Sequence, residues 1–542
     1  MAAASTARRP PPDPSARAPP GGRPLHLHAA VERTPPCRGG PARRAPFHRK
    51  APHARHTRRG AGDPARTGRD QRRAARPAES GTPTQPETRG IELIDESSRR
   101  GRPGALFWVW AAPNASFLTF TMGAVMIAVL GLSLVQAFIV IAAASVGWIL
   151  TGIIAVSGPA AGTSGSVISR AMYGVLGNRL VVGLYGWLLA AVYLSLTWSA
   201  ASINGLGLLG RMGLAQTATL GVVVVLVVSG LTVLVAVYGH GLILKTYPYI
   251  TNFLVVMFVI TSLFMIPHFD FSHAPAEPLG GMHLAMMMTI GFTMLVSTPV
   301  SFINSPDMAR YLPKETPGWR VAAATALGGA LPGIVFTSVG ALIATGAGFD
   351  MVLDPMGAFD AGLPGWFFPL FTIAVIVAAI ALNAMTTYSA SMALQALGIP
   401  IRRIPSALII AVIGTALTIV SVAIYDFTTA VSQMLQVIVV AAGPLMAVFV
   451  ADVLMRRGRY DGVDLLDASP SSSFWYRKGW NLAGLLSLVL GGVASAMCLN
   501  SEVYVGPVAA ATGLDLSIPA GLVIAAGSYV LLSRTRLTAH VA

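Results

Sequence analysis

The chain has 542 residues, of which 54% are hydrophobic and only 11% charged, and its mean hydropathy is +0.64. Soluble globular domains carry about 25% charged residues, so this composition excludes an ordinary soluble domain and indicates a chain that lies mostly in a lipid bilayer. The net charge of +15 is uneven, because residues 1–103 hold 22 Lys and Arg against 9 Asp and Glu, and the remainder holds 16 against 14.

Residues 1–88 are rich in Arg, Pro, Ala, Gly and His and lack the apolar core of a signal peptide. Such a segment buries too little apolar surface to offset the entropy of ordering, so we expect a disordered basic tail. Three interpretations stay open: an over-long gene start, a passive cytoplasmic tail, or a polybasic segment that touches anionic lipid. No aromatic interleaving or folded motif accompanies the charge, so we expect no nucleic-acid partner.

After a cytoplasmic pre-helix segment, 89–103, apolar stretches of membrane-spanning length follow one another. About 20 apolar residues cross a hydrocarbon core of about 30 Å. The stretches are 105–131, 134–156, 180–204, 217–238, 246–267, 282–304, 320–345, 366–389, 405–424, 428–451, 481–499 and 512–533. We therefore predict an all-α polytopic membrane protein with about 12 transmembrane helices.

Positive charge predicts the orientation, because Lys and Arg concentrate in cytoplasmic loops. With the tail inside, one set of loops collects fifteen Lys and Arg, and only Arg211 falls on the other side. The outer loops instead gather Asp270, Glu277, Asp350, Asp354 and Asp360. We expect a multi-pass protein of the cell membrane with both termini in the cytoplasm.

Two of the stretches are interrupted. The first contains Pro113 and Asn114 within residues 111–116, and the sixth, from about Met282, meets Pro299 midway and ends near Asp307. A proline in a helix frees a backbone carbonyl, and broken backbone survives at depth only beside protein or a wet cavity. Paired interruptions in two halves of a chain indicate the binding site of a secondary transporter.

Each interrupted stretch opens a set of five. Residues 104–275 form the first five-helix repeat and residues 276–455 the second, which is inverted because five is odd. A cytoplasmic loop, 456–479, and two further helices with a short cytoplasmic end, 480–542, complete the chain. The pattern predicts a 5+5 inverted repeat plus two extra helices.

Polar and aromatic residues of neighbouring stretches are candidates for the pocket between the interruptions. On the third stretch, Tyr193 and Thr197 lie one turn apart on one face. Tyr193 either contacts a ligand or simply packs within the bundle, as membrane aromatics commonly do. On the eighth stretch, Asn383 offers two donors and an acceptor at depth.

The sequence offers no motif for catalysis or a cofactor. Cys37 and Cys498 have neither disulfide nor metal spacing, and no paired catalytic acids or phosphate-binding glycine loop appear. We expect no enzyme activity, no cofactor and no metal site. No Asp or Glu lies between residues 104 and 269, which argues against a proton-pumping machine.

The chain also contains an ordered series of short motifs. They are Gly90-Ile91-Glu92, Phe107-Trp108-Val109-Trp110, Ser169-Arg170-Ala171, Gly177-Asn178-Arg179, Asp307-Met308-Ala309-Arg310-Tyr311-Leu312-Pro313, Asn383 followed by Tyr388-Ser389-Ala390 and Leu394-Gln395-Ala396-Leu397-Gly398, and Ala447 to Asp452 with Arg456-Arg457-Gly458-Arg459-Tyr460-Asp461. Together they resemble the purine–cytosine permeases of the nucleobase–cation symporter family, which includes hydantoin, allantoin and cytosine carriers. The resemblance covers the chain from about Gly90 to its end.

The resemblance implies a LeuT-type fold in which a planar substrate stacks between aromatics of the third and sixth helices, while an amide of the eighth hydrogen-bonds it. By position, the family's third-helix tryptophan corresponds to Tyr193, the polar residue one turn later to Thr197, and the eighth-helix asparagine to Asn383. The sixth-helix contacts fall among Ser297, Thr298, Ser301 and Phe302.

This chain departs from the sodium-coupled members of that family. They place hydroxyl side chains just before the eighth-helix amide, where this chain has Ala381 and Leu382. Sodium needs oxygen ligands, so we expect coupling to protons or another sodium-independent mode, with Thr386 and Thr387 as hydroxyl alternatives if the correspondence is shifted.

The prediction is therefore a secondary active transporter that imports a nucleobase or related planar N-heterocycle by alternating access. Its expected partners are that heterocycle, a coupling proton and the lipid bilayer. The alternatives are a carrier of the same fold for an amino acid or vitamin, and a passive channel, which would conduct without saturation.

Overall fold

The computed structural model describes residues 85–275, 277–346, 350–351, 354–424, 427–501 and 503–535. In these residues the regular secondary structure is entirely helical, and isolated bridges pair only Arg477 with Trp480 and Asn500 with Val505. The all-α prediction is confirmed for this part of the chain. Residues 1–84, most of the predicted tail, lie outside it.

Within the described residues, eight helical runs are long and apolar enough to cross a bilayer. They are α4 (Leu134–Ser145) with α5 (Trp148–Ala155) and α6 (Ser157–Ala161); α9 (Val175–Val181) with the π-helical η2 (Val182–Leu188) and α10 (Leu189–Arg211); α11 (Ala218–Tyr238); α12 (His240–Met265) with η3 (Ile266–His268); α13 (Gly281–Ser301); α15 (Gly318–Ile343); α17 (Phe368–Ala396); and α18 (Arg403–Ile424). The order follows the predicted series.

Further apolar helices extend this set. The bent pair α2 (Pro103–Asn114) and α3 (Phe117–Ala128) makes a ninth span, and α19 (Phe427–Met455), α21 (Leu482–Cys498) and α23 (Ser517–Leu532) contribute shorter apolar stretches. The predicted total of about 12 spans stays a prediction, since length and composition alone identify these helices.

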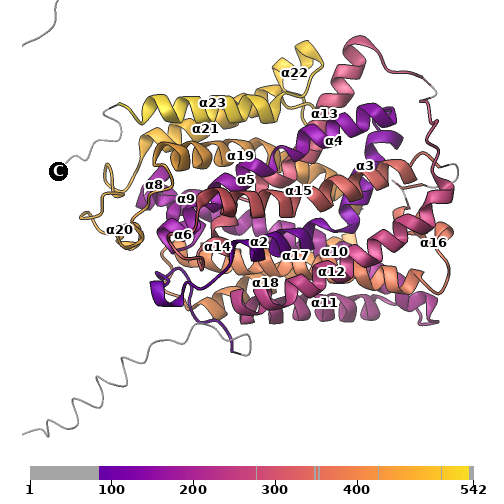
Figure 1. Cartoon of the computed structure of the whole chain (residues 1–542), viewed down its shortest axis with the longest axis horizontal. Coiled ribbons are helices and arrows are strands. Elements are labelled where there is room, and N and C mark those ends of the chain that lie inside the picture. Colours follow the sequence, from indigo (N-terminus) through magenta and orange to yellow (C-terminus); the bar gives the residue numbers. More distant parts are fainter. Residues whose placement is uncertain are drawn as a thin grey trace, which may run out of the picture. The chain divides into compact units, whose positions relative to one another are not determined.

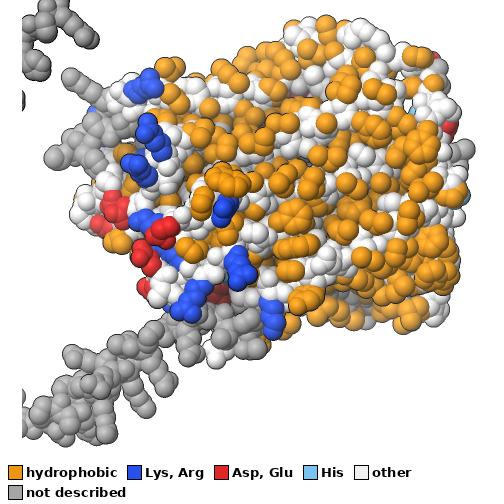
Figure 2. Space-filling view, in the orientation of Figure 1, with side chains coloured by type: hydrophobic (Ala, Val, Ile, Leu, Met, Phe, Trp, Pro, Cys, Tyr) orange, Lys and Arg blue, Asp and Glu red, His pale blue; other side chains and the backbone are white. Residues whose placement is uncertain are grey.

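Short helices connect the longer ones. They are η1 (Glu96–Ser98), α7 (Gly165–Ile168), α8 (Arg170–Tyr173), α14 (Ser305–Ala309), α16 (Pro355–Gly362), α20 (Gly462–Leu466) and α22 (Pro507–Thr512). Figure 1 places α6, α8, α9 and α20 at one end and α16 and α22 at the other. Figure 2 shows Lys and Arg gathered at the first end and a largely hydrophobic face beyond it. We call these the basic end and the opposite end.

Helix contacts repeat between two sets of five spans. α15 packs on α2 and α3 as α13 packs on α4 and α5; α12 packs on α2 as α19 packs on α13; and α11 packs on α17 as α18 packs on α10. When each span of the first set is replaced by the corresponding span of the second, and the reverse, every contact in this list becomes its counterpart in the list. A five-span repeat requires this correspondence. α21 and α23 pack on one another and on α19, outside both sets.

The first interrupted span is broken where the sequence predicts it. α2 ends at Asn114, α3 begins at Phe117, and the two helices are bent by 59°. Nδ2 of Asn114 donates to the carbonyl of Trp110 at 2.8 Å, so a side chain takes over a backbone bond beside Pro113. The break is packed inside protein, since Trp110, Pro113 and Asn114 are all buried.

The second interrupted span breaks three residues later than predicted. α13 continues through Pro299 to Ser301, and residues 302–304 separate it from α14. A proline removes only its own N–H, and Thr151 of α5 satisfies the nearby backbone: its hydroxyl donates to the carbonyl of Pro299 at 2.6 Å. In return, the hydroxyl of Ser305 donates to the carbonyl of Thr151 at 2.9 Å. α5 therefore stabilises both sides of the break.

The segment before α2 is folded onto the basic end. Its backbone donates from Glu87 to Val237 O at 3.2 Å, from Ile94 to Gly162 O at 2.8 Å and from Gly101 to Tyr311 O at 3.1 Å. Glu87 is only 5% exposed. The ordered part therefore begins before the predicted pre-helix segment 89–103, and Glu87 lies inside the fold although it falls within the predicted tail.

Candidate functional site

Two cavities lie in series between the two sets of helices. The first, the break cavity, has a volume of about 70 Å³ and touches both helix breaks, at Pro113 and Asn114 and at Thr298 and Phe302. The second, the basic-end cavity, has a volume of about 130 Å³ and runs from the second break past Asp307. Since roughly 10–15 Å³ of such volume holds one water, the break cavity has room for about five waters.

Tyr193 and Phe302 line both cavities and therefore stand between them. Phe302 is held firmly: its ring stacks on Trp148 with a centroid distance of 5.6 Å and an interplanar angle of 24°, and Trp110 packs edge-on against it at 5.1 Å. An added methyl group on Gly329 of α15 would overlap the Trp148 ring, so glycine there permits this packing. The cavities are thus separated by one fixed and one half-buried aromatic ring.

The structure brings most of the nine predicted site residues to these cavities. Five line the break cavity: Pro113, Asn114, Tyr193, Thr298 and Phe302. Ser301 lines the basic-end cavity instead. Thr197, Ser297 and Asn383 line neither; the hydroxyl of Ser297 donates to the carbonyl of Met294 in its own helix at 2.6 Å.

Asn383 and Thr197 nevertheless form a polar pair between α10 and α17. The hydroxyl of Thr197 lies 2.6 Å from Oδ1 of Asn383 and 2.9 Å from the carbonyl of Tyr193. Asn383 is fully buried, and its Nδ2 has no partner among the described residues. A buried amide without a partner costs about 1–3 kcal/mol, so this donor is available for a ligand that reaches it from the Tyr193 side.

The backbone just before Asn383 is occupied. The hydroxyl of Tyr247 on α12, itself fully buried, donates to the carbonyl of Ala381 at 2.6 Å. The side chains of Ala381 and Leu382 are buried and apolar. In the described part of the chain, no group of three or more His, Cys, Asp or Glu side chains is arranged to hold a metal ion.

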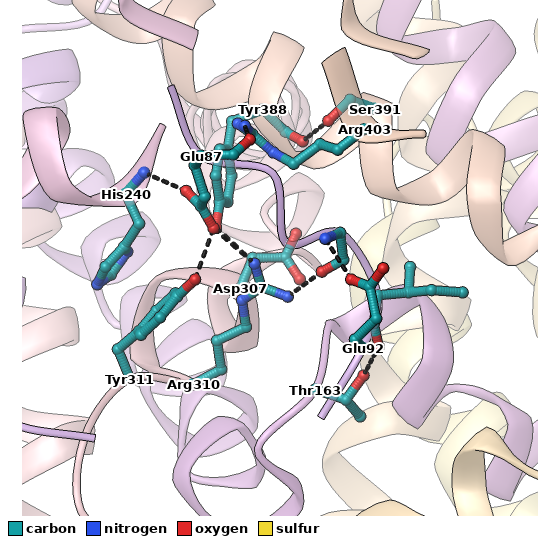
Figure 3. A network of polar contacts seen from close by, with 12 residues as sticks. Glu87, Glu92, Thr163, His240, Asp307, Arg310, Tyr311, Tyr388, Ser391 and Arg403 are labelled. Carbon is teal, nitrogen blue, oxygen red and sulfur yellow. Dashed lines mark hydrogen bonds and ion pairs between the residues drawn. The ribbon is translucent and has the colours of Figure 1, made fainter. Parts of the chain in front are cut away.

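A polar network that the sequence did not reveal closes the basic end (Figure 3). Oε1 of Glu87 accepts from Tyr311 at 2.6 Å and from Arg310 at 3.2 Å, while Arg403 donates to the Glu87 carbonyl at 2.7 Å. Burial alone would raise the pKa of Glu87, but Arg403 and Arg310 outweigh it and hold the pKa below its ordinary value. Glu87 is therefore a carboxylate that balances two buried arginines.

Other residues that sequence reasoning missed line the cavities directly. Trp148 and Thr337 line the break cavity, and Tyr185 and Asp307 line the basic-end cavity. Tyr185 belongs to the π-helical segment η2, and its hydroxyl lies 3.4 Å from the Ser301 carbonyl at the second break. The signal for Trp148 was its place in the middle of an apolar span; a π-helical segment has no comparable sequence signature.

Comparisons with known proteins find relatives of this chain. A family model described as a permease for cytosine/purines, uracil, thiamine and allantoin matches residues 93–517. A putative purine-cytosine permease of Bacillus subtilis (strain 168) is 24% identical over 464 residues, which cover 83% of this chain and 96% of that protein.

Solved structures share the fold. The nucleobase-cation-symport-1 family transporter Mhp1, in a closed conformation with bromovinylhydantoin bound, aligns with a TM-score of 0.65 at 19% identity, covering 82% of this chain and 94% of that one. Its inward-facing conformation aligns with a TM-score of 0.60 at 18% identity, covering 83% and 96%. A Na⁺-coupled sialic acid symporter aligns with a TM-score of 0.51 at 12% identity, covering 81% and 91%.

Proposed function

The chain belongs to the permease family for cytosine/purines, uracil, thiamine and allantoin, and we propose that it imports a nucleobase or related planar N-heterocycle by alternating access, coupled to protons. One observation carries the proposal: the two helix breaks, far apart in sequence, border one small cavity with aromatic walls. Broken helices in matching positions of two repeats are the usual site of solute binding in such carriers.

Side chains around the break cavity suit a flat ring with polar edges. A heterocycle between Tyr193 and Phe302 would gain about 1–3 kcal/mol from stacking, by analogy with bases on aromatic side chains. The free Nδ2 of Asn383 would donate to a ring nitrogen or carbonyl. A site with a buried amide donor rejects solutes that lack an acceptor to match it. Asn383 would therefore select the solute by its polar edge, and the two aromatic rings would select it by its flat shape.

The two cavities suggest the route of the solute. The break cavity and the basic-end cavity share Tyr193 and Phe302, so a rocking movement of one helix set against the other would open the site to one end and then to the other. We assign the basic end to the cytoplasm, since Lys and Arg concentrate on the inner side of membrane proteins. In a cell membrane this orientation places both termini in the cytoplasm and makes transport an uptake.

Contacts around Ala381 support a sodium-independent coupling. Sodium is bound by oxygen atoms, yet Ala381 and Leu382 supply no side-chain oxygen, and the hydroxyl of Tyr247 already occupies the Ala381 carbonyl. Of the two hydroxyl alternatives on the same helix, that of Thr386 lies 3.2 Å from the Leu382 carbonyl, within its own helix. That of Thr387 is fully buried and has no partner among the described residues, so a sodium site would have to use it. A proton needs no such cage, only a titratable group.

Uptake of labelled solutes into cells that express the protein tests the proposal. The panel should hold cytosine, uracil, adenine, allantoin, thiamine and two amino acids, each measured against vector-only cells. We expect saturable uptake of at least one heterocycle and competition by its close analogues. Uptake of amino acids alone would overturn the proposed substrate class, and uptake without saturation would indicate a channel.

A further inference from the structure

Asp307 holds a special position in the two cavities. Among the described residues that line either cavity, it is the only one with a carboxyl group, and none carries a Lys, Arg or His side chain. It lies on α14, directly after the second break, and is only 2% exposed. Burying an ionisable group costs free energy, so such a group beside a solute pathway is a candidate for a functional site.

Few groups stabilise an ionised Asp307. The backbone N–H of Gly165 on α7 donates to Oδ1 at 2.7 Å, and the hydroxyl of Ser389 on α17 also hydrogen-bonds the carboxyl. Within the described part of the chain, no Lys, Arg or His forms an ion pair with it, although its neighbour Arg310 is fully buried nearby. Arg310 instead donates to Glu87, Gly90 and Tyr388 (Figure 3).

Asp307 lies among other ionisable side chains. Those near it, from the elements packed around α14 and around the basic-end cavity, are Glu87, Tyr173, Tyr185, Tyr193, His240, Arg310, Tyr311, Tyr388 and Arg403. The two groups that hydrogen-bond its carboxyl, the Gly165 backbone and the Ser389 hydroxyl, are both uncharged, so no ion pair among the described residues holds the carboxyl in its ionised form.

We propose that Asp307 is the binding site of the coupling proton, which its carboxylate takes up while the site is open to the opposite end and releases to water through the basic-end cavity. The proposal rests on the proposed proton-coupled transport. Protonation neutralises the carboxylate and weakens its bond to Gly165, which loosens the contact between α14 and α7. Because α14 continues the broken sixth span, the charge of one side chain is thereby linked to the mobility of the second break.

The experiment compares four proteins reconstituted in proteoliposomes: wild type, Asp307→Asn, Asp307→Glu and Asp515→Asn. Asp515 is a matched control, because it is also a 2% exposed carboxyl but lies near the opposite end and lines neither cavity. The labelled probe is cytosine, or the heterocycle that wild type takes up in the cell panel. Accumulation is measured in two conditions. In the first, a pH of about 5.5 outside and about 7.5 inside provides an inward proton gradient; in the second, the pH is equal on both sides.

We expect the proton gradient to drive accumulation in wild type, Asp307→Glu and Asp515→Asn. In Asp307→Asn, gradient-driven accumulation should fall by about tenfold or more, because an amide cannot carry the proton, while exchange of labelled for unlabelled probe at equal pH persists. A merely structural Asp307 would lower both activities together. Equal gradient-driven accumulation in wild type and Asp307→Asn would overturn the assignment of Asp307 and leave proton coupling intact; a wild type indifferent to the gradient would overturn the coupling itself.

A measurement on the wild type alone covers the case in which Asp307→Asn does not fold. An apolar carbodiimide reacts with protonated carboxyls, so mass spectrometry should find it on Asp307 at low pH and progressively less as the pH rises. Labelling of Asp307 that does not change between about pH 5 and pH 8, or no labelling while Asp515 reacts, would contradict the proposal.

Discussion

The hydroxyl of Thr197 lies 2.6 Å from Oδ1 of Asn383 and so joins α10 to α17 behind Tyr193. This bond uses the acceptor of the amide and turns its donor, Nδ2, into the group without a partner among the described residues. The pair thus fixes which edge of a ligand Asn383 recognises, namely one that accepts a hydrogen bond.

Replacing Asn383 by Ala should weaken binding strongly while leaving the protein in the membrane. The lost hydrogen bond is worth about 1–3 kcal/mol, a roughly 5- to 150-fold rise in Kd. Equilibrium binding of the labelled heterocycle to purified protein measures it. Thr372→Val is the control, since Thr372 is a fully buried polar residue of the same helix that lines neither cavity. An unchanged Kd in Asn383→Ala would remove this residue from the site.

Phe302→Leu should weaken binding more than it weakens folding. The ring lines both cavities and stacks on Trp148, so its loss removes a stacking surface worth about 1–3 kcal/mol per ring. Phe371→Leu is the control, because Phe371 is buried in an aromatic cluster away from both cavities. We expect similar losses of melting temperature but a raised Kd only in Phe302→Leu. If both variants bind alike, Phe302 is a packing residue.

Gly329→Ala should lower both the stability of the protein and its affinity for the ligand, although Gly329 lines neither cavity. The new methyl group would overlap the ring of Trp148, which must then move away from Phe302 into the break cavity. Overpacking of this kind costs about 1–3 kcal/mol of stability. In Gly230→Ala, where nothing lies within 4 Å of the added methyl, stability and Kd should stay near the wild-type values. A Gly329→Ala protein with wild-type affinity would show that Trp148 does not shape the cavity.

Transport should not depend on sodium. With choline in place of sodium, uptake should be retained, and a proton ionophore should depress it. Tyr247→Phe frees the Ala381 carbonyl but adds no further oxygen, so it should not create a sodium response. Strict sodium dependence of the wild type would show that our interpretation of Ala381 and Leu382 is wrong.

Glu87→Gln should destabilise the protein at neutral pH. It leaves the buried Arg310 and Arg403 without their carboxylate, a loss of roughly 3–5 kcal/mol when one partner of a buried pair is removed. The pKa of Glu87 is lowered by folding, so its stabilising effect is present above its ordinary value of 4.5 and is lost as pH falls below it. Melting temperatures of wild type and variant should therefore converge in acid; a constant difference would contradict the charge argument.

Hydropathy made most of the fold predictable, because each membrane span is a continuous stretch of apolar residues. The first break was predicted at Pro113 because a proline within such a stretch is also a local signal. The second was placed at Pro299 but lies at residues 302–304, because a proline removes only its own N–H and α13 continues past it. Thr151, a partner 148 residues away, instead bonds the Pro299 carbonyl at the end of α13. A hydrogen bond between residues so far apart in the sequence cannot be predicted from the local sequence pattern.

Of the predicted site residues that carry a distinctive side chain at depth, Tyr193 and Phe302 line both cavities, whereas Asn383 lines neither and hydrogen-bonds Thr197. Glu87 was not predicted, because it sits in a polar stretch that resembles the tail, and its partners lie 153 to 316 residues away. Asp307 was read as the end of a span rather than a cavity residue. The sequence suggested few carboxylates at depth, yet the fold buries this one beside the pathway.

A structure determined with the best-bound heterocycle tests the central claim most directly. The account predicts planar density in the break cavity, in contact with Tyr193 and Phe302 and within hydrogen-bond reach of Asn383, while both helices remain broken beside it. Density outside that cavity, or two continuous helices in place of the breaks, would contradict it.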